Sequence, residues 1–289
     1  MADRRLLKLI MRILHHITVG GDNLWVSEAL RKMGLKLEGS GIRNGPLFFE
    51  ISEGDPRWTD VAKLIRQNNA SEEYLAEHVS TEFTQQERDQ ANSLSVGICW
   101  TTGYPEPSDV APVAGTRYLP YFASTYDLTN YCPICLTGAR QNAPFRLKKA
   151  PVWGRRSLFK LNWVLDEIFV KPDVWSTVFR PLGIEFRPVL LHRTGVPMRT
   201  IVQLVIPNET DLMLDGFPYK VCPRCRTKKY APVCRGFSPA PTSPVISISK
   251  SHEYFGHGNA FKAILISKAL FETAKIAKLR GAELDPCAD

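Results

Sequence analysis

Two Cys-Pro-x-Cys motifs are the residues of this sequence whose types and spacing could do chemistry. Cys132 and Cys135 form one pair, Cys222 and Cys225 form the other, and residues 136–221 separate them. A Cys-x-x-Cys turn places two thiolates on one side of a zinc ion, and a second turn completes a tetrahedral structural site. We therefore expect these four cysteines to bind one structural Zn²⁺, with a long folded insertion between the two turns.

Other roles for these thiols remain open. A redox-active Cys-Pro-x-Cys dithiol uses a single pair at a strand-to-helix junction, and residues 136–151 do not have the pattern of a helix. Cys234 follows the second pair closely enough to replace one of the four ligands. His252 and His257 are further candidate ligands, although histidines in a loop beside aromatic residues are more often structural or solvated.

Familiar catalytic motifs are missing from the sequence. It contains no His-Glu-x-x-His motif, no His-x-Glu motif of the zinc deaminases, and no Gly-x-Ser-x-Gly, P-loop or Gly-x-Gly-x-x-Gly motif. Asp166 and Glu167 are acids without a recognisable partner spacing. We expect a protein that is not an enzyme, and a nuclease or a thiol oxidoreductase is the enzymatic alternative.

The basic residues are concentrated beside the two cysteine pairs. The chain has a formal net charge of +8, and residues 140–160 and 220–235 contain Lys and Arg but no Asp or Glu. If the cysteine pairs meet, we expect these segments to form one basic surface that binds a partner. The candidate binding residues are Arg146, Lys148, Lys149, Arg155, Arg156, Lys160, Arg224, Arg226, Lys228 and Lys229.

Two kinds of partner suit a basic surface. An acidic protein would be attracted by charge complementarity. Nucleic acid is the alternative, because basic residues interleaved with aromatic side chains suit single strands and RNA. The interleaved aromatic residues are Phe145, Trp153, Phe159 and Tyr230. Part of the positive charge would also offset the negative charge of a zinc ion bound by four thiolates.

The elements that must position these residues are predicted to be short. Residues 4–17 have the spacing of a basic amphipathic helix, and a second helix is predicted over 24–33, so residues 1–40 form a helical N-terminal extension. Residues 41–289 form the zinc-binding body, which ends in a strand, a helix and a strand over 262–286. The predicted fold class is α+β, with mixed short strands and helices organised around the four-cysteine site.

Capping residues predict where three of the helices begin. Asp55 followed by Pro56 is a strong helix start, and Thr84 with Glu87 three residues later forms a capping-box pattern. Ser267 is the predicted N-cap of the C-terminal helix.

The sequence predicts a protein without a membrane anchor. No segment reaches the roughly 20 apolar residues that a membrane-spanning helix requires. Lys8 and Arg12 interrupt the apolar run at the N-terminus, and no cleavage pattern of small residues follows it. We therefore expect a cytoplasmic protein whose cysteines are kept reduced.

The two cysteine motifs and the C-terminal segment ILISKALFETAKIAKLRGAELDP together resemble the bacterial double-CXXCG motif proteins. Members of that family are found among the immunity proteins of bacterial toxin systems. The resemblance implies that the four cysteines bind zinc and that the protein acts by binding another protein, a toxin. In place of the glycine that follows each pair in the family, this chain has Leu136 and Arg226.

Overall fold

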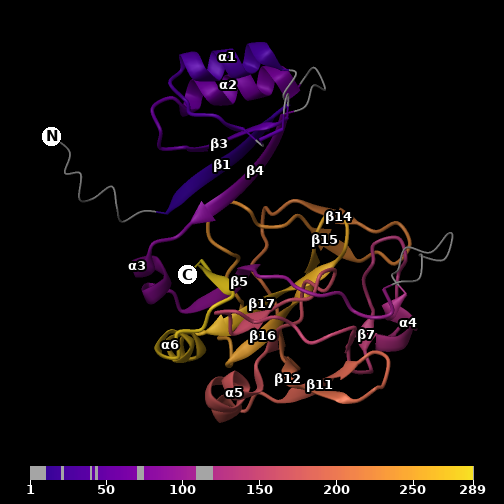
Figure 1. Cartoon of the computed structure of the whole chain (residues 1–289). Helices are drawn as coiled ribbons and strands as arrows, with labels where there is room; N and C mark the ends of the chain where they lie inside the picture. Colours follow the sequence, from indigo (N-terminus) through magenta and orange to yellow (C-terminus); the bar gives the residue numbers. More distant parts are fainter. Residues whose placement is uncertain are drawn as a thin grey trace. The chain divides into compact units, whose positions relative to one another are not determined.

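The computed structural model describes residues 11–20, 23–39, 41–42, 45–69, 75–108 and 120–288 (Figure 1). Its secondary structure is mostly strand, with short helices between the strands. The chain forms two compact units. Unit 1 contains Met1–Asp89 and Val233–Gly236, and unit 2 contains Gln90–Pro232 and Phe237–Asp289.

Unit 1 is an antiparallel sheet with two helices on one face (Figure 1). The strand order is β2 (Glu38–Gly39), β3 (Leu47–Ser52), β1 (Arg12–Val19) and β4 (Leu75–Glu82). The helices are α1 (Leu24–Lys32) and α2 (Trp58–Asn69), and α3 (Gln85–Gln90) follows β4. Apolar side chains of β1 and β3 pack against both α1 and α2 in one core. Burial of this core stabilises the sheet and the helices together.

The prediction of an N-terminal helix over residues 4–17 is wrong for the part of it that the structure describes. Residues 12–19 form the central strand β1, the described residues show no N-terminal helical appendage, and residues 4–10 lie outside them. Apolar residues at 13, 14 and 17 fit a helical spacing, but Ile17 and Val19 alternate with polar neighbours and are both buried. Pairing with β3 on one side and β4 on the other makes the strand the more stable choice for these residues.

A short segment from late in the chain completes unit 1. The backbone N–H of Gly236 donates to Thr81 Oγ1 at 2.9 Å, and the guanidinium of Arg235 lies 2.7 Å from Glu53 Oε2. Glu53 also contacts His15, whose buried ring stacks on Trp58. Residues 233–236 are thus part of the first unit, although they come after both cysteine pairs in the chain.

The described residues of unit 2 form two larger sheets and one small one. The seven-stranded sheet has the order β14 (Tyr219–Val221), β15 (Lys228–Tyr230), β16 (Ile248–Phe255), β17 (Phe261–Ser267), β5 (Ser93–Cys99) and β18 (Ala282–Pro286), with β13 (Glu209–Thr210) beside β16. The five-stranded sheet has the order β8 (Arg146–Leu147), β11 (Phe186–Leu191), β12 (Pro197–Leu204), β10 (Phe169–Val170) and β9 (Leu158–Phe159). The strands β6 (Tyr126–Asp127) and β7 (Arg140–Gln141) form a two-stranded sheet.

The α-helices among the described residues of this unit are α4 (Tyr121–Thr125), α5 (Pro172–Val174) and α6 (Lys268–Ile276). A π-helix (Trp175–Phe179) and a 3-10 helix (Arg180–Leu182) follow α5 directly. The main core lies where apolar residues of β5, β16 and β17 pack against those of β10 and β12, with α6 beside them. A second core contains the rings of Tyr121, Phe145, Phe159 and Phe169. The described residues contain no helix that is long and apolar enough to cross a membrane.

The capping predictions identify two of the helix starts correctly. Thr84 and Glu87 form a reciprocal capping box before α3, and Ser267 Oγ accepts a hydrogen bond from Leu270 N at the start of α6. Asp55 instead accepts from Arg57 N in a turn just ahead of α2, which begins at Trp58. The predicted strand, helix and strand at the C-terminus are β17, α6 and β18.

Candidate metal centre

The four predicted cysteines come together in unit 2. Their Sγ atoms all lie within 4.8 Å of one another. Cys132 and Cys222 are 3.7 Å apart at sulfur, and Cys135 and Cys225 are 3.4 Å apart, although the members of each pair are 90 positions apart in the chain. Four thiolates at ~2.3 Å from a tetrahedral zinc ion lie ~3.8 Å from one another. The arrangement therefore fits a single structural Zn²⁺.

Each cysteine pair lies in a tight turn between two antiparallel strands. The first knuckle, residues 132–137, belongs to the connection between β6 and β7. In it, the backbone N–H of Cys132 donates to Thr137 O at 2.9 Å, and that of Leu136 donates to Cys132 O at 2.8 Å. These two hydrogen bonds hold both cysteine side chains on the same side of the turn.

The second knuckle, residues 222–227, repeats this geometry directly between β14 and β15. The backbone N–H of Cys222 donates to Thr227 O at 2.9 Å, and that of Arg226 donates to Cys222 O at 3.0 Å. Two turns with the same hydrogen bonds thus face one another across the thiol cluster.

The residue after each pair has the left-handed backbone that usually favours glycine. The φ angle is 64° at Leu136 and 63° at Arg226. A left-handed conformation costs a residue with a side chain roughly 1–2 kcal/mol. The chain therefore forms both knuckles without a glycine at either position, and the bonds of a metal site can offset this cost.

Two threonines next to the sulfurs escaped the sequence prediction. Thr137 Oγ1 lies 3.1 Å from Cys135 Sγ, and Thr227 Oγ1 lies 3.2 Å from Cys225 Sγ. Such second-shell hydrogen bonds orient metal ligands. The signal was present in the sequence, because both motifs read Cys-Pro-x-Cys-x-Thr.

The four thiols differ in their surroundings. Burial raises the pKa of Cys135 to about 12. The hydroxyl of Thr227 lowers the pKa of Cys225 to about 6. Cys132, Cys135 and Cys222 are buried, whereas Cys225 is exposed.

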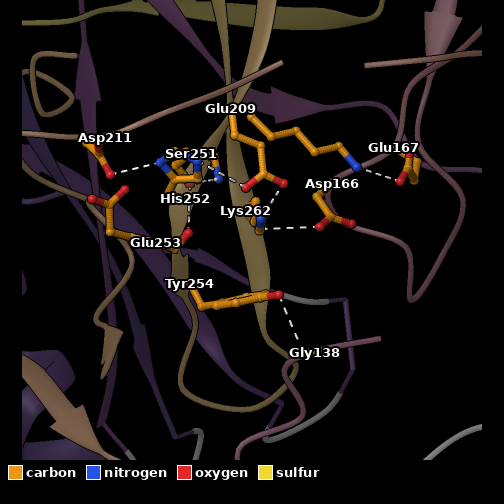
Figure 2. A network of polar contacts seen from close by, with 12 residues as sticks. Gly138, Asp166, Glu167, Glu209, Asp211, Ser251, His252, Glu253, Tyr254 and Lys262 are labelled. Carbon is orange, nitrogen blue, oxygen red and sulfur yellow. Dashed lines mark hydrogen bonds and ion pairs between the residues drawn. The ribbon is translucent and has the colours of Figure 1, made fainter. Parts of the chain in front are cut away.

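The first knuckle is also supported from β15 and β16. Lys229 Nζ donates to Cys135 O at 3.2 Å and to Gly258 O at 2.9 Å. The backbone N–H of Gly138 donates to the Tyr254 hydroxyl at 3.4 Å, a contact drawn in Figure 2. Lys229, a predicted partner-binding cation, thus contacts the backbone of the metal site.

Gly138 gives a direct test of this geometry. A Cβ atom at Gly138, where φ is 90°, would lie 2.1 Å from Asn130 O, so Gly138→Ala must displace the first knuckle. We expect a loss of about 2–4 kcal/mol of stability together with weaker zinc binding. The matched control is Gly216→Ala, which has a φ of 80° but no atom within 4 Å, and should cost only about 1 kcal/mol. Urea unfolding and zinc titration of both variants would check this, and equal losses would contradict it.

The other candidate ligands lie elsewhere. His252 contacts Asp211 at 2.8 Å and Glu209 at 3.5 Å in the polar network of Figure 2. His257 is not a member of the thiol cluster, and Cys234 belongs to unit 1. We therefore assign the metal site to the cluster of Cys132, Cys135, Cys222 and Cys225.

The predicted basic residues divide between several elements. Arg224, Arg226 and Lys228 are exposed on the second knuckle and β15. The exposed residues of the other segment are Lys148, Lys149, Arg155 and Arg156, while Arg146 and Lys160 are half-buried. The guanidinium of Arg156 lies over the ring of Trp100, 4.3 Å from the ring centre. Binding of a partner by any of these residues stays a prediction.

Two aromatic residues expected beside this charge belong to the core. Phe145 and Phe159 are fully buried, and both rings pack against Phe169. Trp153 packs against Phe159 and donates its indole N–H to Thr200 O. Phe145 and Phe159 therefore cannot stack on nucleic acid bases, since each already fills the interior beneath the basic segment.

A buried ion pair in unit 2 is a second feature that the sequence did not predict. Glu167 Oε1 lies 2.5 Å from Lys250 Nζ, and its other oxygen accepts from Gln203 Nε2 at 2.9 Å. Gln203 also exchanges amide hydrogen bonds with Gln141 of β7, the strand that follows the first knuckle. Burial raises the pKa of Glu167, and the charge of Lys250 opposes that shift.

A polar chain connects the ion pair's neighbours to the first knuckle (Figure 2). Lys262 Nζ lies 2.5 Å from Glu209 Oε1 and also over the ring of Tyr254. The backbone N–H of Lys262 donates to Asp166.

No family model matches the chain, and no similar curated protein or solved structure was found.

Proposed function

We propose that this chain is a zinc-stapled protein that acts by binding a protein partner. The observation that carries the proposal is the convergence of four thiols from two knuckles into one largely buried cluster. Zinc held by four thiolates supplies a cross-link between the knuckles and leaves no open position for a substrate. Its role is therefore to hold the second knuckle and its strands in a fixed shape.

The partner surface is the knuckle hairpin, which we define as residues 219–230 (β14, the second knuckle and β15). Tyr219 is 50% exposed and Val221 is 43% exposed, and Ile134 at the tip of the first knuckle is 47% exposed. The exposed cations of the hairpin are Lys220, Arg224, Arg226 and Lys228. Exposed apolar side chains surrounded by positive charge suit an acidic protein surface.

A bacterial toxin is the partner that the family resemblance suggests. Neutralising a toxin needs a stable complementary surface and no chemistry, and the zinc cross-link supplies stability to that surface. The direct test is to express, with and without this protein, a candidate toxin gene found next to the gene for this protein. An immunity role is supported if cells that make the toxin survive only when they also make this protein. It is contradicted if toxin-producing cells die with and without this protein.

Charge reversal on the knuckle hairpin tests the surface itself. We expect Lys220→Glu with Arg224→Glu to weaken toxin binding by about 100-fold, because both charges face an acidic partner. The matched control is Lys149→Glu with Arg155→Glu, which changes the net charge equally at exposed residues outside the hairpin. Titration calorimetry at equal zinc content would measure the affinity of both double variants for the toxin. Equal weakening by the two pairs would contradict the assignment of the partner surface to the knuckle hairpin alone.

Nucleic acid is the second candidate partner, and one contact favours it. Lys228 lies 4.8 Å from the centre of the exposed Tyr219 ring, which combines a stacking surface with a cation. Such pairs bind single strands, with an affinity that falls steeply as salt increases. A mobility-shift assay at about 50 mM salt without a bound fraction would eliminate this candidate.

A further inference from the structure

Cys225 differs from the other three thiols of the cluster in its access to solvent. The side chains around it leave it exposed, whereas Cys132, Cys135 and Cys222 are 4%, 6% and 5% exposed. A small reagent in solution can therefore approach Cys225 more readily than it can approach the three buried cysteines. Access is one of the two properties that decide which cysteines are oxidised, and thiolate character is the other.

Cysteines that bind a metal ion do so as thiolates, so Cys225 would be an exposed and therefore reactive thiolate. Zinc binding keeps cysteine ligands deprotonated. The nearest thiol partner of Cys225 across the cluster is Cys135, whose Sγ is 3.4 Å away. The two sulfurs come from different knuckles, so a bond between them would replace the metal cross-link with a covalent one.

We propose that Cys225 is a site of oxidation by peroxides, with Cys135 as the resolving thiol, and that the resulting disulfide releases the metal. This inference rests on the proposed zinc binding. It assigns to the cluster a regulatory role in addition to its structural one.

The chemistry balances with a peroxide as the oxidant. The Cys225 thiolate attacks one oxygen of hydrogen peroxide, the O–O bond breaks, and hydroxide leaves, which gives a sulfenic acid. The Cys135 thiolate then attacks the sulfur of Cys225, an S–S bond forms, and the S–O bond breaks with loss of a second hydroxide. The two sulfurs together lose two electrons, peroxide gains them, and two protons from solvent convert both hydroxides to water.

Loss of two thiolates removes half of the ligand set. Cys132 and Cys222 remain, and two ligands do not hold a structural zinc ion. Because the knuckle hairpin begins three residues ahead of Cys222 and includes Cys225, oxidation would also alter the proposed partner surface.

The test uses the full-length zinc-loaded protein and hydrogen peroxide. Zinc release is followed with a colorimetric chelator, and the disulfide is mapped by mass spectrometry after digestion. We expect release to accompany a Cys135–Cys225 disulfide. A Cys222–Cys225 disulfide, or release without any disulfide, would overturn the assignment. Cys234, the exposed cysteine of unit 1, serves as an internal reference whose oxidation should leave the zinc in place.

Two matched histidine variants isolate the exposed position. Histidine is itself a zinc ligand, so Cys225→His and Cys132→His each leave a three-cysteine, one-histidine site. We expect Cys225→His to slow peroxide-driven release about tenfold and Cys132→His to change it by no more than about twofold. Equal rates in the two variants would contradict the proposal. If a variant does not take up zinc, disulfide mapping in the wild-type protein still tests whether Cys225 pairs with Cys135.

Zinc content measured before any peroxide is added separates this proposal from the proposed function. Protein purified without zinc, and unable to take it up, would refute the zinc staple. The disulfide pairing formed by peroxide in that metal-free protein would still test whether Cys225 reacts first and with Cys135. Loaded protein that keeps its zinc under peroxide would refute only the oxidation site.

Discussion

Removing the metal from the four-cysteine cluster will lower the melting temperature of unit 2 by about 10 °C or more, because a ligand bound only by the folded state adds its binding free energy to stability. Cys132, Cys135 and Cys222 of the two knuckles form a buried cluster of their own, and each knuckle contains a left-handed non-glycine residue. Without metal, three buried sulfurs lose their common partner. Calorimetry with zinc, with a chelator, and after zinc is restored would measure the effect.

The control for this prediction compares two cysteines of unit 2. Cys132→Ser should bind far less zinc and melt like the chelated protein. Cys99→Ala removes a half-buried thiol outside the cluster, so it should keep the zinc of the wild type. Equal melting temperatures for the metal-free and the zinc-loaded protein would show that metal binding by the cluster does not stabilise the fold.

Replacing Lys250 with Met will destabilise the protein by about 3–5 kcal/mol at neutral pH, because it leaves the buried carboxylate of Glu167 without its counter-charge. The Lys250 and Glu167 side chains are only 13% and 9% exposed, so water cannot take the place of the lost partner. The paired change Lys250→Met with Glu167→Gln should recover most of the loss, since a glutamine can still bind Gln203.

The pH dependence of the single variant follows from the same pair. Burial already raises the pKa of Glu167, and removing Lys250 takes away the charge that opposes the shift. The folded variant then holds a proton that the unfolded chain, with a carboxyl pKa of about 4.3, releases. Stability falls with rising pH wherever the folded state binds more protons. Urea unfolding should therefore show a smaller loss near pH 5 than near pH 8, and a loss independent of pH would contradict the mechanism.

The cysteine site could be predicted from the sequence because its information is local. Each Cys-Pro-x-Cys turn specifies two ligands. The threonine two positions after each pair was not predicted to contact sulfur, but it is local information of the same kind. The helix starts at Thr84 and Ser267 were predictable for the same reason, since a cap involves residues only three positions apart. The capping residues and the knuckles form their contacts within a single turn of chain.

The features that escaped prediction depend on distant residues. Glu167 and Lys250 are 83 positions apart, and no pattern in either segment indicates the pairing. Residues 12–19 fit a helix by spacing and become a strand only because β3 and β4 flank them. Phe145 sits among cations in the sequence, but its ring lies inside the second core. The composition of a segment shows which residues are neighbours in the chain, but it does not show which side chains are buried and which are exposed.

The late segment that completes unit 1 has a consequence for synthesis of the chain. Thr81 and Glu53 emerge from the ribosome long before Gly236 and Arg235, the residues that bind them in the finished protein. During that interval the sheet can pair its strands, but its polar edge lacks those partners. The N-terminal unit therefore reaches its final form only after both cysteine pairs have been made, and a fragment that stops at Asp89 would lack part of its own domain.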